Sequence, residues 1–182
     1  MKKVTLLPQI GVHIEGLGQL NFGDNKEQVF KLLGEPSFVC SEKRFEFKDY
    51  GCFIDFKKSD NTFECAEFWN DGKDNAAQVY IYDIEVLQNE AMPIKKLLQE
   101  KNNKEEAKDG WYINIDVIYA GGSQHTMLNY IEELKKDGQF EGIAQEQALI
   151  DLEKAKYFSA FGIGYKGYCK DGLAEIDMLM LK

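Results

Sequence analysis

Residues 162–167 read Gly-Ile-Gly-Tyr-Lys-Gly, which matches the G-x-G-x-x-G pattern of dinucleotide-binding loops. Such a loop follows a strand and begins a helix, so that the helix N-terminus faces the pyrophosphate. In this sequence a turn and a final strand are predicted after the glycines instead. We therefore interpret the pattern as glycines that allow a bent or bulged strand.

Ser123 and His125 are close enough in sequence to suggest nucleophilic catalysis. A triad needs its serine on a strained, exposed turn and a carboxylate that orients the histidine. Ser123 is better explained as a helix cap, and no G-x-S-x-G sequence occurs. We interpret His125, and His13 in an alternating N-terminal strand, as structural residues.

The cysteines do not have the spacing of a zinc site. No C-x-x-C pair occurs, and the two histidines stand far apart. We therefore predict no metal and no cofactor, and we expect buried, reduced thiols that behave as small apolar side chains. The four cysteines are Cys40, Cys52, Cys65 and Cys169.

Acidic residues are plentiful, but no two of them form an evident catalytic pair. Asp83, Glu85 and Asp116 lie opposite the apolar faces of predicted strands. A glycosidase-like or phosphatase-like pair needs two carboxylates in one cleft, and only the fold can bring them there. We interpret these three residues as part of a solvated sheet face.

The composition indicates a folded protein that does not span a membrane. The chain has 182 residues, of which 44% are hydrophobic and 13% aromatic, enough for one substantial core. No apolar run approaches the roughly 20 residues that cross a bilayer. The N-terminus lacks the long apolar region of a signal peptide. We expect a cytoplasmic protein.

The charge favours a basic protein partner. Lys and Arg number 22 against 31 Asp and Glu, a net charge of -9, and the acidic excess is largest in residues 61–120. Arg44 is the only arginine, whereas nucleic-acid binding relies on basic stripes and arginine. We therefore exclude a nucleic-acid ligand and expect an acidic surface that steers a basic protein.

One helix has both of its ends marked in the sequence. Asp24 is a predicted N-cap with Glu27 completing a capping box, and Gly34 supplies the left-handed residue after the helix. Three strands should follow as an antiparallel meander, over residues 44–48, 52–56 and 63–69. In the third strand Trp69 is expected to share a face with Glu67 and Phe63.

The second half has a similar order of elements. We predict an α+β fold with an antiparallel sheet, short helices on one of its faces, and a tandem helix-plus-meander repeat. The units would be residues 1–78 and 79–182, within one compact domain that shares a sheet. The later predicted elements are strands at 80–86, 111–119, 158–169 and 173–181, a helix that starts near Pro93, and helices at 123–138 and 144–156.

The segment from Leu17 to Trp69 combines a capped helix with an aromatic-Gly strand break and a closing strand. Its characteristic residues are Phe22-Gly23, Lys26-Glu27-Gln28-Val29, Leu32-Leu33-Gly34-Glu35-Pro36, Tyr50-Gly51 and Trp69. With these residues the segment resembles the repeat unit of beta-lactamase-inhibitory-protein-like domains and of small outer-membrane-assembly lipoproteins. This resemblance implies a sheet whose free face and loops grip a protein, and the chain also looks like cytosolic relatives that act as immunity proteins.

The resemblance and the charge lead to one main hypothesis. The protein would be a non-enzymatic immunity protein that neutralises a bacterial toxin by occluding a basic active site. The alternatives are a small-molecule enzyme or ligand-binding domain with a pocket between helices and sheet, and an envelope-assembly adaptor, which the missing signal sequence disfavours. The partner-binding residues that we predict are Trp69, Asp71, Asp74, Asp83, Glu85, Tyr112 and Asp116.

Overall fold

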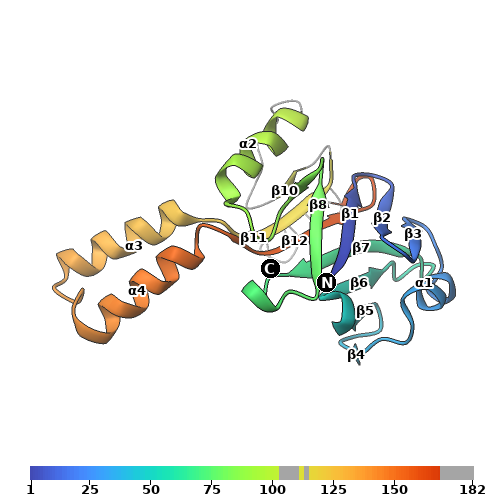
Figure 1. Ribbon diagram of the computed structural model, residues 1–182, viewed down its shortest axis with the longest axis horizontal. Coiled ribbons are helices and arrows are strands. Elements are labelled where there is room, and N and C mark those ends of the chain that lie inside the picture. The colour runs from blue at the N-terminus through green and yellow to red at the C-terminus, as the bar shows by residue number, and fades with distance from the viewer. Residues whose placement is uncertain (103–110, 113–114, 169–182) are drawn as a thin grey trace, which may run out of the picture.

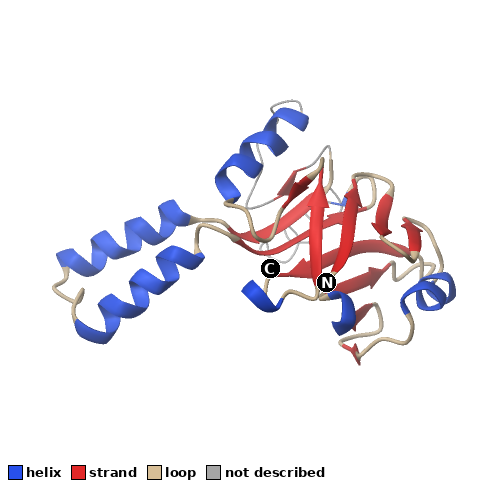
Figure 2. Cartoon of the chain, in the orientation of Figure 1, coloured by secondary structure: helices blue, strands red, loops and turns tan. Residues whose placement is uncertain are grey.

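The computed structural model describes residues 1–102, 111–112 and 115–168, without the side chains of Lys73, Trp111 and Tyr112. Two β-sheets lie against each other, and a pair of helices projects from them (Figures 1 and 2). The predicted α+β class with an antiparallel sheet is confirmed. The predicted strand at 173–181 lies outside the described residues.

The first sheet has five strands in the order β3-β2-β1-β8-β9. Strands β1 and β8 run parallel, with Val4 opposite Val79, and the other neighbours are antiparallel. This mixed sheet was not expected from the sequence. Its strands are β1 (Lys2–Leu7), β2 (Gly11–Ile14), β3 (Gly18–Asn21), β8 (Ala77–Ile81) and β9 (Ile84–Glu85).

The second sheet has seven strands in the order β10-β11-β12-β7-β6-β5-β4, all antiparallel. The predicted meander forms its middle as β5, β6 and β7, which confirms those three strands. Its strands are β4 (Phe38–Val39), β5 (Arg44–Phe47), β6 (Cys52–Phe56), β7 (Phe63–Trp69), β10 (Trp111–Tyr112), β11 (Val117–Gly121) and β12 (Phe158–Gly164).

One hydrophobic core fills the space between the two sheets. The five-stranded sheet contributes β-branched and Leu side chains, and the seven-stranded sheet contributes mainly Phe. Helices α1 (Lys26–Leu33) and α2 (Ala91–Lys101) add Val29 and Ile94 to the same core. The core face of the larger sheet is thus covered by a second sheet together with two helices. On its opposite face Tyr168 packs against Cys65 and Ile118.

Helix α1 begins one residue later than its capping pattern predicted. Asn25 is the N-cap: its side chain accepts from the Gln28 N–H at 2.9 Å, and Gln28 accepts from the Asn25 N–H at 2.8 Å. Asp24 instead accepts from the Asn21 N–H, which orients the chain before the helix. Gly34 ends the helix as predicted, with a positive φ of 87°, but its ψ of -171° is not that of the left-handed helical conformation that was expected.

Two segments that were predicted as single strands are hairpins. The strand predicted at 80–86 turns at Tyr82 and Asp83, whose φ values are 49° and 65°, so that Tyr80 pairs with Glu85. The strand predicted at 111–119 also reverses, because Tyr112 pairs with Val117. Both turns were missed because the alternation of apolar and polar residues continues across them, and because neither contains the glycine that usually marks a positive φ.

A β-bulge changes which residues of β7 face the core. The register between β6 and β7 shifts at Asp55 and Phe56, so Phe63 packs in the core while Cys65 lies on the opposite face. The expectation that Phe63 shares a face with Trp69 was therefore wrong. An extra residue in one strand reverses side-chain parity beyond it.

Helices α3 (Gln124–Lys136) and α4 (Gly142–Lys154) form a hairpin that extends away from the sheets (Figure 1). Both helices were predicted to within two residues at each of their ends. The proposed boundary between residues 78 and 79 falls inside β8, and both sheets combine strands from the two sides of it. The tandem repeat stays a prediction. Within the described part, no helix has the length and apolar composition needed to cross a bilayer.

Candidate functional site

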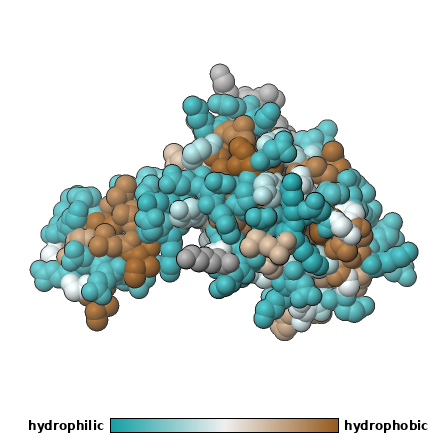
Figure 3. Space-filling model, in the orientation of Figure 1, coloured by the Kyte–Doolittle hydropathy of each residue, from teal (hydrophilic) through white to brown (hydrophobic). Residues whose placement is uncertain are grey.

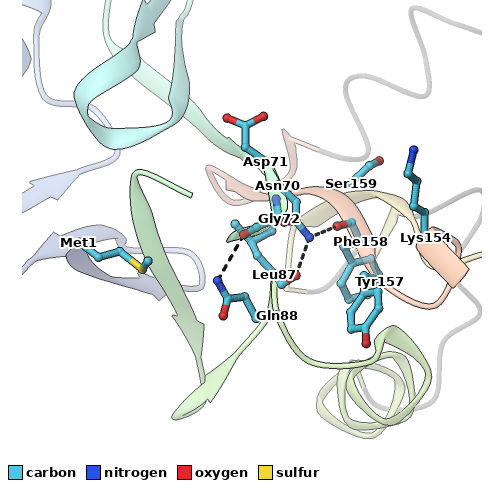
Figure 4. Close-up of a pocket in the computed structure, with 10 residues that line it drawn as sticks. All are labelled: Met1, Asn70, Asp71, Gly72, Leu87, Gln88, Lys154, Tyr157, Phe158 and Ser159. Carbon is cyan, nitrogen blue, oxygen red and sulfur yellow. Dashed lines mark hydrogen bonds between the residues drawn. The ribbon is translucent and has the colours of Figure 1, made fainter. Parts of the chain in front are cut away.

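An open pocket of about 950 Å³ lies where the helical hairpin joins the sheets (Figure 4). Three segments far apart in sequence form most of its wall, namely the chain after β7, the chain after β9 and the link from α4 to β12, and Met1 adds to it. Phe158 and Leu87 are buried beneath it, and Asp71 and Lys154 stand exposed at its rim. The lining residues are Met1, Asn70, Asp71, Gly72, Leu87, Gln88, Lys154, Tyr157, Phe158 and Ser159.

The side chain of Asn70 holds these segments together. Its Nδ2 donates to the carbonyls of Leu87 and Phe158, at 2.5 and 2.8 Å. Its Oδ1 accepts from the Gly72 N–H at 2.9 Å and from Nδ2 of Asn75 at 3.2 Å. Because all four hydrogen bonds join backbone or buried groups, the pocket wall is fixed before any ligand arrives.

Glu85 positions the second segment of the wall. Its carboxylate accepts from the backbone N–H groups of Leu87 and Gln88, at 3.2 and 2.6 Å. The side chain of Gln88 then reaches the carbonyl of Gly72 at 3.4 Å. Glu85 was predicted as a partner-binding residue, which stays a prediction; in the structure its carboxylate also orders the loop that lines the pocket.

Trp69 and Asp71 connect the pocket with the outer face of the seven-stranded sheet. The indole Nε1 of Trp69 donates to Asp71 at 2.6 Å, and its ring packs on Phe53 with the centroids 4.9 Å apart. Both aromatic rings are partly exposed. An aromatic pair beside a carboxylate is the composition found at the centre and rim of protein interfaces.

Arg44 completes this outer face. It lies over the Phe53 ring at 4.3 Å and pairs with Asp55 at 2.8 Å and Glu67 at 3.2 Å. Burial raises the pKa of the Asp55 carboxyl, against the opposing attraction of Arg44. Burial alone would lower the pKa of Arg44, but Asp55 and Glu67 together raise it. The arginine is thus held within the protein by two carboxylates.

Asp116 was predicted on the outer face of a strand, and this prediction was wrong. It is 1% exposed and has φ of 49° at the reversal before β11. Its carboxylate accepts from the Gly167 N–H at 3.0 Å, and its carbonyl accepts from the Gly164 N–H at 2.8 Å. Asp116 therefore joins this turn to the chain after β12, and it is unable to meet a partner.

The remaining predicted residues are dispersed. Asp74 is exposed in the short 3₁₀ helix η2 (Gly72–Asp74), next to the pocket. Asp83 is exposed at the tip of the β8–β9 hairpin. The side chain of Tyr112 lies outside the described part of the structure. The fold thus brings together Trp69, Asp71 and Asp74, with Glu85 as a supporting residue.

The residues that were considered for cofactor binding or catalysis have structural roles or lie exposed without a catalytic partner among the described residues. The glycines at 162 and 164 belong to β12, where a Cβ on Gly162 would stand 2.2 Å from the carbonyl of Ala66. Ser123 is the N-cap residue of α3, and exposed His125 contacts its neighbour Thr126. Among the described residues there is no group of three or more His, Cys, Asp or Glu able to hold a metal.

The cysteine prediction was correct in two of the three described positions. Cys52 and Cys65 are buried free thiols, but Cys40 is exposed. Burial raises the pKa of both buried thiols, and for Cys65 the charge of Asp55 adds to this effect. Cys169 lies outside the described residues.

The pocket suits binding rather than proton transfer, because its floor is apolar and its charged groups, Asp71 and Lys154, stand at the rim. The sequence analysis missed Asn70, although the run Asn70-Asp71-Gly72 after a strand is a turn signal. In comparisons with known proteins, no family model, no curated protein and no solved structure matches the chain.

Proposed function

We propose that this protein is a non-enzymatic inhibitor that binds a basic protein and occludes it. In its specific form it is an immunity protein that neutralises a bacterial toxin in the cytoplasm. The observation that carries the proposal is the hydrogen bond from Trp69 to Asp71, because it joins the aromatic outer face and the pocket into one continuous surface.

Several properties of this surface support a protein as its ligand. The rings of Trp69 and Phe53 contact each other, and Trp69 is also hydrogen-bonded to Asp71. Because these contacts already restrict the two side chains, less side-chain entropy is lost when a partner buries them. The carboxylates of Asp71 and Asp74 stand exposed beside them. The net charge of -9 would speed association with a basic protein.

The second candidate is a small-molecule binding protein or enzyme. The volume of about 950 Å³ favours it, since ligand pockets span roughly 300–1,000 Å³. A thermal-shift screen against metabolites tests this candidate, and a saturable rise in melting temperature that a Tyr157→Ala variant abolishes would support it.

The main proposal is tested by affinity capture from the host cell, with the reading frames that flank the gene co-expressed. The expected result is capture of a basic polypeptide, with a yield that falls steeply as salt rises. An Asp71→Asn/Asp74→Asn variant should capture less, because Asn keeps the shape but removes both charges.

A Glu15→Gln/Glu35→Gln variant is the matched control. It removes two exposed charges from other surfaces and should capture as much as the unmodified protein. The captured polypeptide must also lose its activity when the purified protein is added. Capture that is insensitive to salt, or equal losses in the two double variants, would overturn the proposal.

A further inference from the structure

Helix α4 has apolar residues on two sides. Ala148, which is buried, and half-buried Leu152 form one side. Ile143 and Ile150 are 86% and 50% exposed, and their spacing of seven places them together on the other side. A helix that is apolar on both sides is normally covered on both.

The described part of the chain covers only one of these sides. Helices α3 and α4 pack chiefly against each other, and the hairpin stands clear of the two sheets (Figure 1). Figure 3 shows hydrophobic side chains along the hairpin. We call the exposed side of α4, formed by Ile143, Glu146 and Ile150, the outer stripe.

The outer stripe leads directly to the pocket. Lys154 is four residues after Ile150, so it continues the same side of the helix, and it lines the pocket together with Tyr157 (Figure 4). A ligand that lies along the stripe therefore reaches the pocket at one of its ends. This continuity makes the stripe an extension of the binding surface.

The charge of the hairpin indicates which ligand fits. Residues 124–154 contain seven Asp and Glu against three Lys. Glu146 is exposed on the stripe itself, between the two isoleucines. A second copy of this chain would bring another acidic hairpin, and an anionic lipid surface would also be repelled. A segment with aliphatic residues flanked by Lys or Arg complements the stripe.

We propose that the outer stripe docks a basic amphipathic helix of the partner protein, an inference that rests on the proposed function. Aliphatic residues of that helix, spaced by three, four and seven positions, pack against Ile143 and Ile150. Its basic residues face Glu146. The end of the helix nearest Lys154 delivers the adjoining residues of the partner to the pocket.

The probe for this inference is a fluorescein-labelled peptide of Leu and Lys, about 18 residues or about five helical turns long. Its leucines form one helical face, and a peptide of the same composition with scrambled order serves as the control for charge alone. We expect saturable anisotropy binding of the amphipathic peptide and at least about tenfold weaker binding of the scrambled one.

An Ile143→Glu/Ile150→Glu variant should weaken binding of the amphipathic peptide by about tenfold or more, because the loss of apolar burial and the cost of burying two carboxylates against the leucines outweigh the attraction of these carboxylates for the lysines. The control is Tyr130→Glu, which adds the same charge type at a residue of α3 that is 49% exposed. It should bind as the unmodified protein does. Circular dichroism and thermal melts check that all variants fold alike.

Equal weakening by the two variants, or equal binding of the two peptides, would overturn the inference. So would sedimentation that shows a dimer which Ile150→Glu dissociates, since the stripe would then bind a second copy. The two proposals fail separately. If the stripe variant still captures the natural partner while Asp71→Asn/Asp74→Asn does not, the proposed function stands and the docked helix is rejected.

Discussion

Replacing Asn70 with Ala should destabilise the protein and loosen the pocket together. The change removes four hydrogen bonds, two donated by Nδ2 and two accepted by Oδ1. A hydrogen bond contributes about 0.5–1.5 kcal/mol net. Water from the open pocket replaces part of this loss, so we expect the free energy of unfolding to fall by about 2–4 kcal/mol.

Urea denaturation followed by tryptophan fluorescence measures this change, because Trp69 adjoins the network. Asn89→Ala is the matched control: Asn89 is exposed and its side chain donates a single hydrogen bond, to the Glu85 carbonyl. It should cost about 0.5 kcal/mol. If Asn70→Ala cost no more than this control, the account of Asn70 as the tie between three segments would be refuted.

Three further predictions concern the outer face, strand packing and thiols. Burial raises the pKa of Asp55 in the folded protein, so its contribution to stability is lost as pH rises from about 4 through that raised pKa. The Asp55→Asn variant should lack this decline. If the free energies of unfolding of the two proteins differed by the same amount at every pH, this prediction would be contradicted. Gly162→Ala should lower the free energy of unfolding by about 2–3 kcal/mol, because the added Cβ meets the backbone of β7. Gly138→Ala should lower it by about 1 kcal/mol, because Gly138 has a φ of 66° but open space around it. Equal losses in chemical denaturation would count against the close approach of β12 and β7. In a Cys169→Ser variant, a thiol reagent should react quickly with exposed Cys40 and with Cys52 and Cys65 only on unfolding, and a second fast thiol in the kinetics would show that the buried pair is accessible.

Local features of the sequence were enough to predict α1 and the three strands of the meander. Helix capping depends on residues within one turn, such as Asn25 and Gln28, so a one-residue error in the cap was the only loss. The two hairpins were missed for a local reason as well. Tyr82 and Asp83 adopt positive φ without glycine, and only pairing with the neighbouring strand reveals the turn.

The candidate site was only partly predictable. Trp69, Asp71 and Asp74 were selected for their residue types in an acidic region, and the fold gathers them beside one pocket. Asp116 was selected for the same reason, but burial and the Gly167 N–H give it a structural role. A carboxylate in an alternating pattern does not reveal whether a later segment of chain covers it.

The sequence by itself determined the α+β class, the three strands of the meander, the existence of helices α3 and α4 and the acidic charge, because these depend on periodicity, capping and composition. Only the tertiary structure decided that two sheets enclose the core, and that Asn70 meets Phe158 across 88 positions of the chain. The physical reason is that local propensity acts within a few residues. Which distant segments meet depends on how the whole core packs and how every buried polar group finds its partner.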